Sequence, residues 1–141
     1  MNESLPHLLL LSNFAATLFM IGIIWFVQVV HYPLFARVEP GSFVTYEREH
    51  TRRTTWIVAP LMIVEAVVAS ALLLLDAGPA TALGALLLVG IWASTFFVQV
   101  PCHRVLERGW SASAHTRLVR SNWLRTALWT ARSSIAVALL V

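Results

Sequence analysis

The chain has 141 residues, of which 58% are hydrophobic and 12% are charged, and its ten basic residues are all arginine and give a formal charge of +3. Soluble domains carry about a quarter charged residues, so this composition excludes an ordinary water-soluble domain and indicates a protein that lies in a lipid bilayer. The arginines form no basic tail, so we expect no nucleic-acid partner, and the single cysteine, Cys102, excludes an internal disulfide and a cysteine-based zinc site.

Four apolar stretches are long enough to cross a bilayer, which takes about 20 helical residues. In chain order they cover residues 8–30, 54–75, 77–102 and 122–141. Asp76-Ala77-Gly78-Pro79 predicts a tight turn between the second and third. The sequence therefore predicts an all-α, integral membrane four-helix bundle, with residues 1–141 forming a single transmembrane domain.

The arginines outside these stretches predict the orientation in the membrane. They lie in the two longer connections: Arg37, Arg48, Arg52 and Arg53 in one, and Arg104, Arg108, Arg117 and Arg120 in the other. Because basic loops stay in the cytoplasm, we expect a multi-pass protein of a bacterial-type inner (plasma) membrane with both termini on the non-cytoplasmic side. We also expect the charged run Glu47, Arg48, Glu49, Arg52 and Arg53 to form a solvated helix face.

The two halves of the chain share a pattern. Phe26-Val27-Gln28-Val29 matches Phe97-Val98-Gln99-Val100, and His31 and His103 follow these motifs. A break then ends in a serine suited to cap a helix, Ser42 or Ser111, and leads to His50-Thr51-Arg52 or His115-Thr116-Arg117 and to an interfacial tryptophan, Trp56 or Trp123. The order of these features predicts two parallel αα-hairpin repeats, over about 1–76 and 77–141.

The repeat brings one acidic and one basic residue to equivalent positions. Glu65 lies nine residues after Trp56, and Arg132 lies nine residues after Trp123. At 1.5 Å per residue both are roughly 13 Å inside the interface, where a lone charge is costly. We therefore predict a Glu65–Arg132 ion pair inside the bundle, with either a structural or a catalytic role.

Polar side chains on three of the helices are spaced to share a face. Gln28 and His31 are three residues apart, and Gln99 and His103 are four apart. The last helix carries one stripe, made of Asn122, Arg125, Trp129 and Arg132. Because polar groups inside a membrane face the bundle interior or a wet cavity, we expect these residues to line a polar pocket that opens to the cytoplasm.

Three kinds of chemistry suit that pocket. His31, His103 and His50 are candidate ligands of iron, zinc or another transition metal, with Glu65 as a further ligand. Alternatively, His31 and His103 hold a haem from its two sides. In the third interpretation no metal takes part: Arg125 or Arg132 binds an anionic or quinone-like oxygen, and a histidine acts as general base. For His7 and His115 we expect only caps or bridges of helix ends.

Val100-Pro101-Cys102-His103, followed by Asn122-Trp123-Leu124-Arg125-Thr126, resembles the end of the anthrone-oxygenase-like family of small four-span membrane proteins. The resemblance covers about a third of the chain. It implies oxidation of aromatic, quinone-forming substrates, and it transfers Asn122 and Arg125 as site residues.

These observations favour a membrane oxidoreductase with a cytoplasm-facing pocket for a lipophilic aromatic or quinone-like substrate, with or without a metal or haem. The alternative is a non-enzymatic carrier or assembly factor that binds haem, metal or a small molecule. We expect the lipid bilayer and a lipophilic small molecule as partners. The sequence is also compatible with a homo-oligomer. The candidate catalytic residues are Glu65, Arg132, His31 and His103, and the candidate substrate-binding residues are Gln28, Gln99, Asn122, Arg125 and Trp129.

Overall fold

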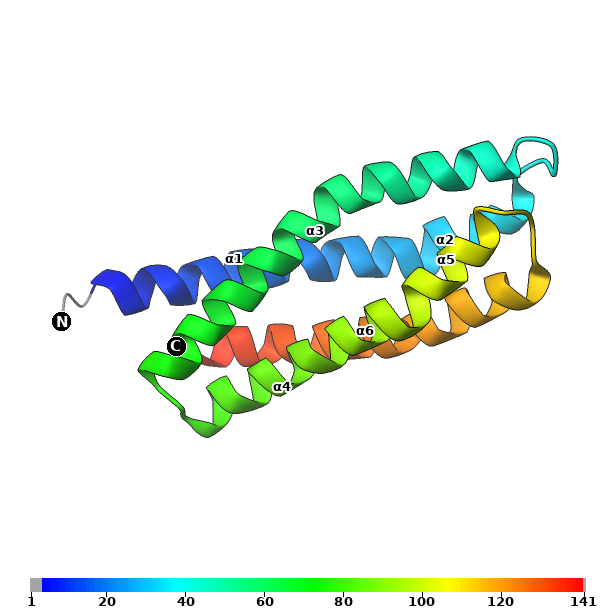
Figure 1. Cartoon of the computed structure of the whole chain (residues 1–141). Coiled ribbons are helices and arrows are strands. Elements are labelled where there is room, and N and C mark those ends of the chain that lie inside the picture. The colour runs from blue at the N-terminus through cyan, green and yellow to red at the C-terminus, as the bar shows by residue number, and fades with distance from the viewer. Residues whose placement is uncertain (1–3, 141) are drawn as a thin grey trace.

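The computed structural model describes residues 4–140, and these form a bundle of four long helical segments with no strand (Figure 1). The elements in chain order are α1 (Ser4–Phe26), the π-helical turn η1 (Val27–His31), α2 (Tyr32–Leu34), the 3-10 turn η2 (Phe35–Arg37), α3 (Phe43–Leu75), α4 (Pro79–Ser94), the π-helical turn η3 (Thr95–Gln99), α5 (Val100–Leu106) and α6 (Ala112–Ala138). The predicted all-α, four-helix architecture is confirmed; Val141, the last residue of the predicted fourth span, lies outside the described residues.

The helix ends follow local signals in the sequence. α3 ends at Leu75 and α4 begins at Pro79, as the predicted turn requires, and proline suits this first position because it has no N–H to leave unbonded. α3 and α6 begin directly after Ser42 and Ser111. The Ser111 hydroxyl accepts a hydrogen bond from the Ala114 N–H at 3.3 Å, whereas Ser42 makes no such bond.

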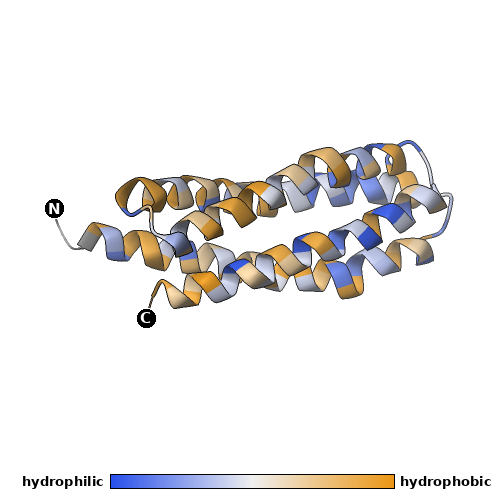
Figure 2. Ribbon diagram, turned by 90° about the horizontal axis from the view of Figure 1, so that it is seen from below, coloured by the Kyte–Doolittle hydropathy of each residue, from blue (hydrophilic) through white to orange (hydrophobic). Residues whose placement is uncertain are grey.

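Three of the helical segments are long and apolar enough to cross a membrane, namely Leu5–Arg37, Phe43–Leu75 and Pro79–Leu106. α6 is not one of them, because Arg117, Arg120, Arg125 and Arg132 make it much less apolar. The outer surface of the bundle is nevertheless apolar: Phe19 is 67% exposed, and Leu74 is 89% exposed. Hydrophilic residues gather toward the end that carries the two long connections (Figure 2).

Buried apolar residues form two clusters along the bundle. One lies at mid-length and includes Met20, Met62, Ile91 and Trp129. The other lies nearer the long connections and includes Tyr32, Phe35, Phe43, Leu106 and Leu118. Polar buried side chains lie beside both clusters and form the groups described next.

Candidate functional site

Glu65 and Arg132 meet in the interior, as the repeat predicts. Arg132 Nε donates to Glu65 Oε1 at 3.2 Å, and the two side chains are almost fully buried. The Thr17 hydroxyl donates to the same carboxylate oxygen at 2.9 Å, and Trp129 Nε1 donates to the other at 3.1 Å. The predicted ion pair is confirmed.

The remaining nitrogens of Arg132 are also bonded. Nη1 donates to the Gly84 carbonyl at 2.6 Å, and Nη2 donates to Asn13 Oδ1 at 2.7 Å. A Cβ at Gly84 would lie 3.4 Å from Nη1, which is an ordinary van der Waals contact. Because no polar atom of the Glu65–Arg132 pair is left without a partner, the geometry favours the structural role, and the catalytic assignment stays a prediction.

Arg125 lies seven residues before Arg132 in the sequence and has very different surroundings. It is 6% exposed, its Nη1 donates to Asn122 Oδ1 at 3.2 Å, and the Tyr32 hydroxyl lies close enough to interact with the guanidinium. Asn122 in turn donates to Gln28 Oε1 at 2.9 Å, and the guanidinium lies 5.2 Å from the ring centroid of Trp129. Within residues 4–140 no carboxylate pairs with Arg125, so it is a buried cation without a counter-charge.

Arg125 lines a cavity of about 580 Å³ between α3 and the α4–α5 segment. The walls are apolar and include Val58, Ala59, Met62, Trp92 and Phe96. The polar lining residues Tyr32, His50, Gln99 and His103 join Arg125 at one side. Three buried polar atoms without a partner belong to residues of this lining: Arg125 Nε, Trp92 Nε1 and Gln99 Oε1. Two of these atoms are donors and one is an acceptor.

His103 is held in the cavity lining by two partners. Its Nδ1 lies 2.5 Å from Glu47 Oε1, and its Nε2 lies 3.0 Å from the Tyr32 hydroxyl. With Glu47 ionised, Nδ1 carries a proton and donates it, so in the neutral ring Nε2 accepts from Tyr32. In this arrangement the Nε2 lone pair of His103 is occupied by the Tyr32 hydroxyl, and both residues line the cavity.

Glu47 corrects one prediction. We expected it on a solvated helix face, but its side chain is fully buried. Glu47 shares the inward face of α3 with Phe43 and His50, which lie four residues before it and three after it. The other members of that charged run behave as predicted: Arg48 is exposed, and Glu49 pairs with Arg52 and Arg53.

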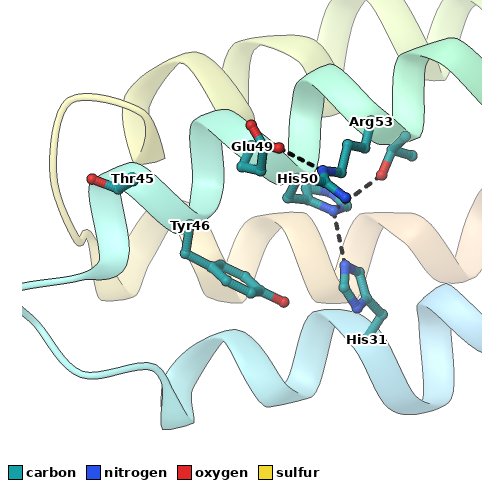
Figure 3. Close-up of a pocket in the computed structure, with 7 residues that line it drawn as sticks. His31, Thr45, Tyr46, Glu49, His50 and Arg53 are labelled. Carbon is teal, nitrogen blue, oxygen red and sulfur yellow. Dashed lines mark hydrogen bonds and ion pairs between the residues drawn. The ribbon is translucent and has the colours of Figure 1, made fainter.

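His31 of η1 and His50 of α3 form a pair. His31 Nε2 and His50 Nδ1 are 2.8 Å apart, and the Thr54 hydroxyl lies 3.1 Å from the same Nδ1 (Figure 3). One ring must donate and the other accept, so at most one of them is doubly protonated. They line a second cavity, of about 430 Å³, into which Figure 3 shows the Tyr46 hydroxyl pointing. His50 lines both cavities.

The histidines are close together without forming a metal centre in this geometry. The His50 ring centroid is 4.6 Å from that of His31 and 5.4 Å from that of His103. In the part of the chain that the structure describes, no group of three or more His, Cys, Asp or Glu side chains is arranged to hold a metal ion. The metal and haem assignments therefore stay predictions. The Nε2 of His115 lies 2.8 Å from the backbone carbonyl oxygen of Tyr32, and this bond bridges two helices as expected.

Since the Tyr32 carbonyl accepts only, His115 Nε2 is the donor in that bridge. Sequence reasoning missed three residues of the cavity region: Tyr32, Glu47 and Trp92. Glu47 had a usable signal, because it lies one helical turn before His50 on the same face. Tyr32 directly follows His31 and is the first residue after the π-helical turn η1.

The fold and the site define a class of protein: an all-helical bundle with three helices of membrane-spanning length and an apolar cavity with a polar edge. Comparisons with known proteins do not narrow this class, because no protein-family model, no curated protein and no solved structure matches the chain.

Proposed function

We propose that the chain is an integral membrane protein of four spans, with α6 as the fourth and with both long connections in the cytoplasm. The burial of Arg125 and Arg132 supports this, because an arginine-bearing helix is tolerated in a bilayer when its charges face the bundle interior. The apolar outer surface, which includes Leu124 on α6 at 56% exposure, also supports it.

We propose further that the protein is an oxidoreductase that acts on a lipophilic aromatic compound with an acidic ring hydroxyl, of the hydroquinone type. The observation that carries this proposal is the unpaired guanidinium of Arg125 at the edge of an apolar cavity. A buried cation without a counter-charge is costly, and an anionic ring oxygen would both compensate it and occupy its free N–H. The ring itself fits between walls that carry Trp92 and Phe96.

His103, which lines the same cavity as Arg125, is the base that takes up and returns a proton. After the Tyr32 hydroxyl turns aside, His103 Nε2 takes the proton of the ring hydroxyl, and Glu47 stabilises the imidazolium that forms. The anion then gives two electrons and its second hydroxyl proton to dioxygen, and His103 returns the first proton. The products are the quinone and hydrogen peroxide, which balances one hydroquinone and one dioxygen.

Two further features support the proposal. The resemblance to the anthrone-oxygenase-like family rests partly on Asn122 and Arg125, which form one hydrogen-bonded pair beside the cavity. The repeated Gln-containing motifs both overlap π-helical turns, η1 and η3, and such turns are frequent at functional sites. This coincidence also supports the proposed duplication of an αα-hairpin.

The test is oxygen uptake by the purified protein with 2-decylhydroquinone as the probe. We expect catalysed uptake with equimolar peroxide, and we expect His103→Gln to slow it about 10²–10⁴-fold, the usual contribution of a general base. His7→Gln, which changes an exposed histidine of α1, should leave it unchanged. Uptake by the wild-type protein no faster than the uncatalysed reaction would reject the enzyme, and stoichiometric binding without turnover would favour the carrier alternative.

A further inference from the structure

We infer that the cavity beside Arg125 takes its occupant sideways, from the cytoplasmic leaflet of the bilayer. This inference rests on the proposed membrane orientation and deepens the proposed function, because it makes the substrate an amphiphile dissolved in lipid. It differs from the expectation of a pocket that opens directly to cytoplasmic water.

Two side-chain bonds cross from α3 to the α5 end and bridge the cavity on its cytoplasmic side. The Thr51 hydroxyl donates to Glu107 Oε1 at 2.6 Å. One turn earlier on α3, Glu47 holds His103. Both Thr51 and Glu107 line the cavity, so their bond lies across the route that water would take between these two helices.

Deeper in the bilayer α3 and α4 are held together by apolar packing, through the cluster that includes Met62, Leu88 and Ile91. None of the side-chain hydrogen bonds of the described residues links α3 to α4. The walls here include Trp56, which is 77% exposed, and Phe96, which is 56% exposed. Trp56 belongs at the membrane interface, and Met62 lies about 9 Å deeper along the helix. At that depth the surroundings of the bundle are acyl chains, so the open side of the cavity faces lipid.

The helix that forms one wall is weakened at this level. Pro60 lies inside α3 and is exposed. It has no N–H for the carbonyl of Trp56, so one hydrogen bond of the helix is missing beside the opening. A wall with a missing bond yields more easily to a bulky ring than an unbroken helix does.

Charge at the outer edge of the opening suits an amphiphile with an electron-rich head. Arg52 on α3 and Arg104 on α5 both line the cavity. Arg52 is paired with Glu49, whereas Arg104 makes no ion pair within residues 4–140. A ring head drawn from the interface would therefore pass Arg104 and end at Arg125, with its apolar tail left between Trp56 and Phe96.

The accessibility of spin labels tests this route without any assay of turnover. In a Cys102→Ala background, a nitroxide is attached at Ala59→Cys, which lies in the cavity wall. Its collisions with dioxygen, which concentrates in lipid, are compared with its collisions with a water-soluble nickel chelate. Ile57→Cys, at an exposed apolar position, is the lipid reference, and Arg48→Cys, at an exposed charged position, is the water reference.

We expect the label at Ala59→Cys to match the lipid reference, and the same result at Val58→Cys, a second wall position that serves if the first variant folds poorly. We also expect Thr51→Ala, which removes the bridge to Glu107, to raise collisions with the nickel chelate. A label at Ala59→Cys that meets the chelate as readily as the label at Arg48→Cys would overturn the lateral route. Because no oxidation is measured, that result is independent of the test of enzyme activity.

Discussion

Two arginines on the same helix face have opposite surroundings. Arg132 has a partner for each of its three guanidinium nitrogens. Arg125 has a hydrogen bond from Nη1 to Asn122, no ion pair among the described residues and a free Nε. Sequence spacing put both in one polar stripe, and only their neighbours from other helices distinguish them. Arg132 therefore belongs to the framework of the bundle, and Arg125 is the residue left available for a ligand.

Glu65→Gln should destabilise the protein by about 3–5 kcal/mol, the usual cost of leaving one member of a buried pair alone. Arg132 would then keep its bonds to Asn13 and Gly84 without a compensating charge. The free energy of unfolding, measured by denaturant titration in detergent micelles, checks this. Glu39→Gln changes an exposed carboxylate and is the matched control. Equal stability of the two variants would contradict a structural role for the pair.

Glu47→Gln should lower turnover with the decyl hydroquinone at least tenfold, because the amide keeps a hydrogen-bond acceptor for His103 Nδ1 but lacks the charge that stabilises the imidazolium. The effect should fall on kcat rather than on KM, since Glu47 does not line the cavity. Steady-state kinetics on folded protein provide the measurement, with Glu39→Gln again as control. Unchanged kcat would remove Glu47 from the proposed mechanism.

At the residue scale, contacts that follow from equal sequence intervals could be predicted. The burial of a side chain by a partner far away in the sequence could not. The Glu65–Arg132 pair followed from two equal intervals after Trp56 and Trp123. The burial of Glu47 depends on His103, which is 56 residues away. Charged residues near a membrane interface are usually solvated. Composition alone therefore predicts that Glu47 is exposed to water, whereas it is buried.

At the scale of elements, two helical segments contain π-helical turns shortly before the cavity residues Tyr32 and His103. η1 ends at His31 and leads to Tyr32, while η3 ends at Gln99, four residues before His103. A π-helical turn makes room for one more residue than an α-helical turn and so shifts the faces of the residues that follow. The apolar periodicity is nearly the same in both helix types, which is why the sequence did not predict these turns.

Helix boundaries were more predictable, because single residues determine them. The Asp76 turn and the Ser111 cap of α6 are local signals that need no tertiary partner, whereas α3 begins after Ser42 without a side-chain cap. The prediction of a fourth span at α6 is not confirmed, because its arginines make it less apolar and the described residues hold three other helical segments apolar enough to cross a membrane. The burial of Arg125 and Arg132 depends on the assembled bundle, in which Arg132 pairs with Glu65 and Arg125 lines the cavity.

Pro60→Ala should stabilise α3 and slow the entry of the probe. Alanine restores the hydrogen bond to the Trp56 carbonyl, which proline in a helix interior forfeits at a cost of up to about 3 kcal/mol, and the repaired helix yields less at the opening. Pro79→Ala is the matched control, because Pro79 is at the first position of α4, where proline is tolerated. Denaturant titration and the rate of probe binding provide the two readouts. Probe binding by Pro60→Ala at the wild-type rate would contradict a role for this residue in access to the cavity.

For the whole molecule, the distribution of arginine predicts the topology. Reporter fusions at Ser42 and Ser111 should report a cytoplasmic location, and a fusion at Gly78 should report the opposite side, because both long connections carry arginine and the Asp76 turn carries none. The structure is consistent with this topology, because α3 and α6, which follow Ser42 and Ser111, begin at the same end of the bundle (Figure 1). A cytoplasmic reading at Gly78 would contradict the orientation.

The central claim is that Arg125 is the ligand-binding cation of the cavity, and equilibrium binding of 2-decylhydroquinone tests it most directly. Measured without oxygen, so that no turnover occurs, Arg125→Gln should weaken binding about 10- to 100-fold, which corresponds to the loss of one charge-assisted hydrogen bond of about 1.5–3 kcal/mol. Arg120→Gln changes an exposed arginine of the same helix and should bind like the wild-type protein. Equal affinity of the wild-type protein and the two variants would contradict the claim.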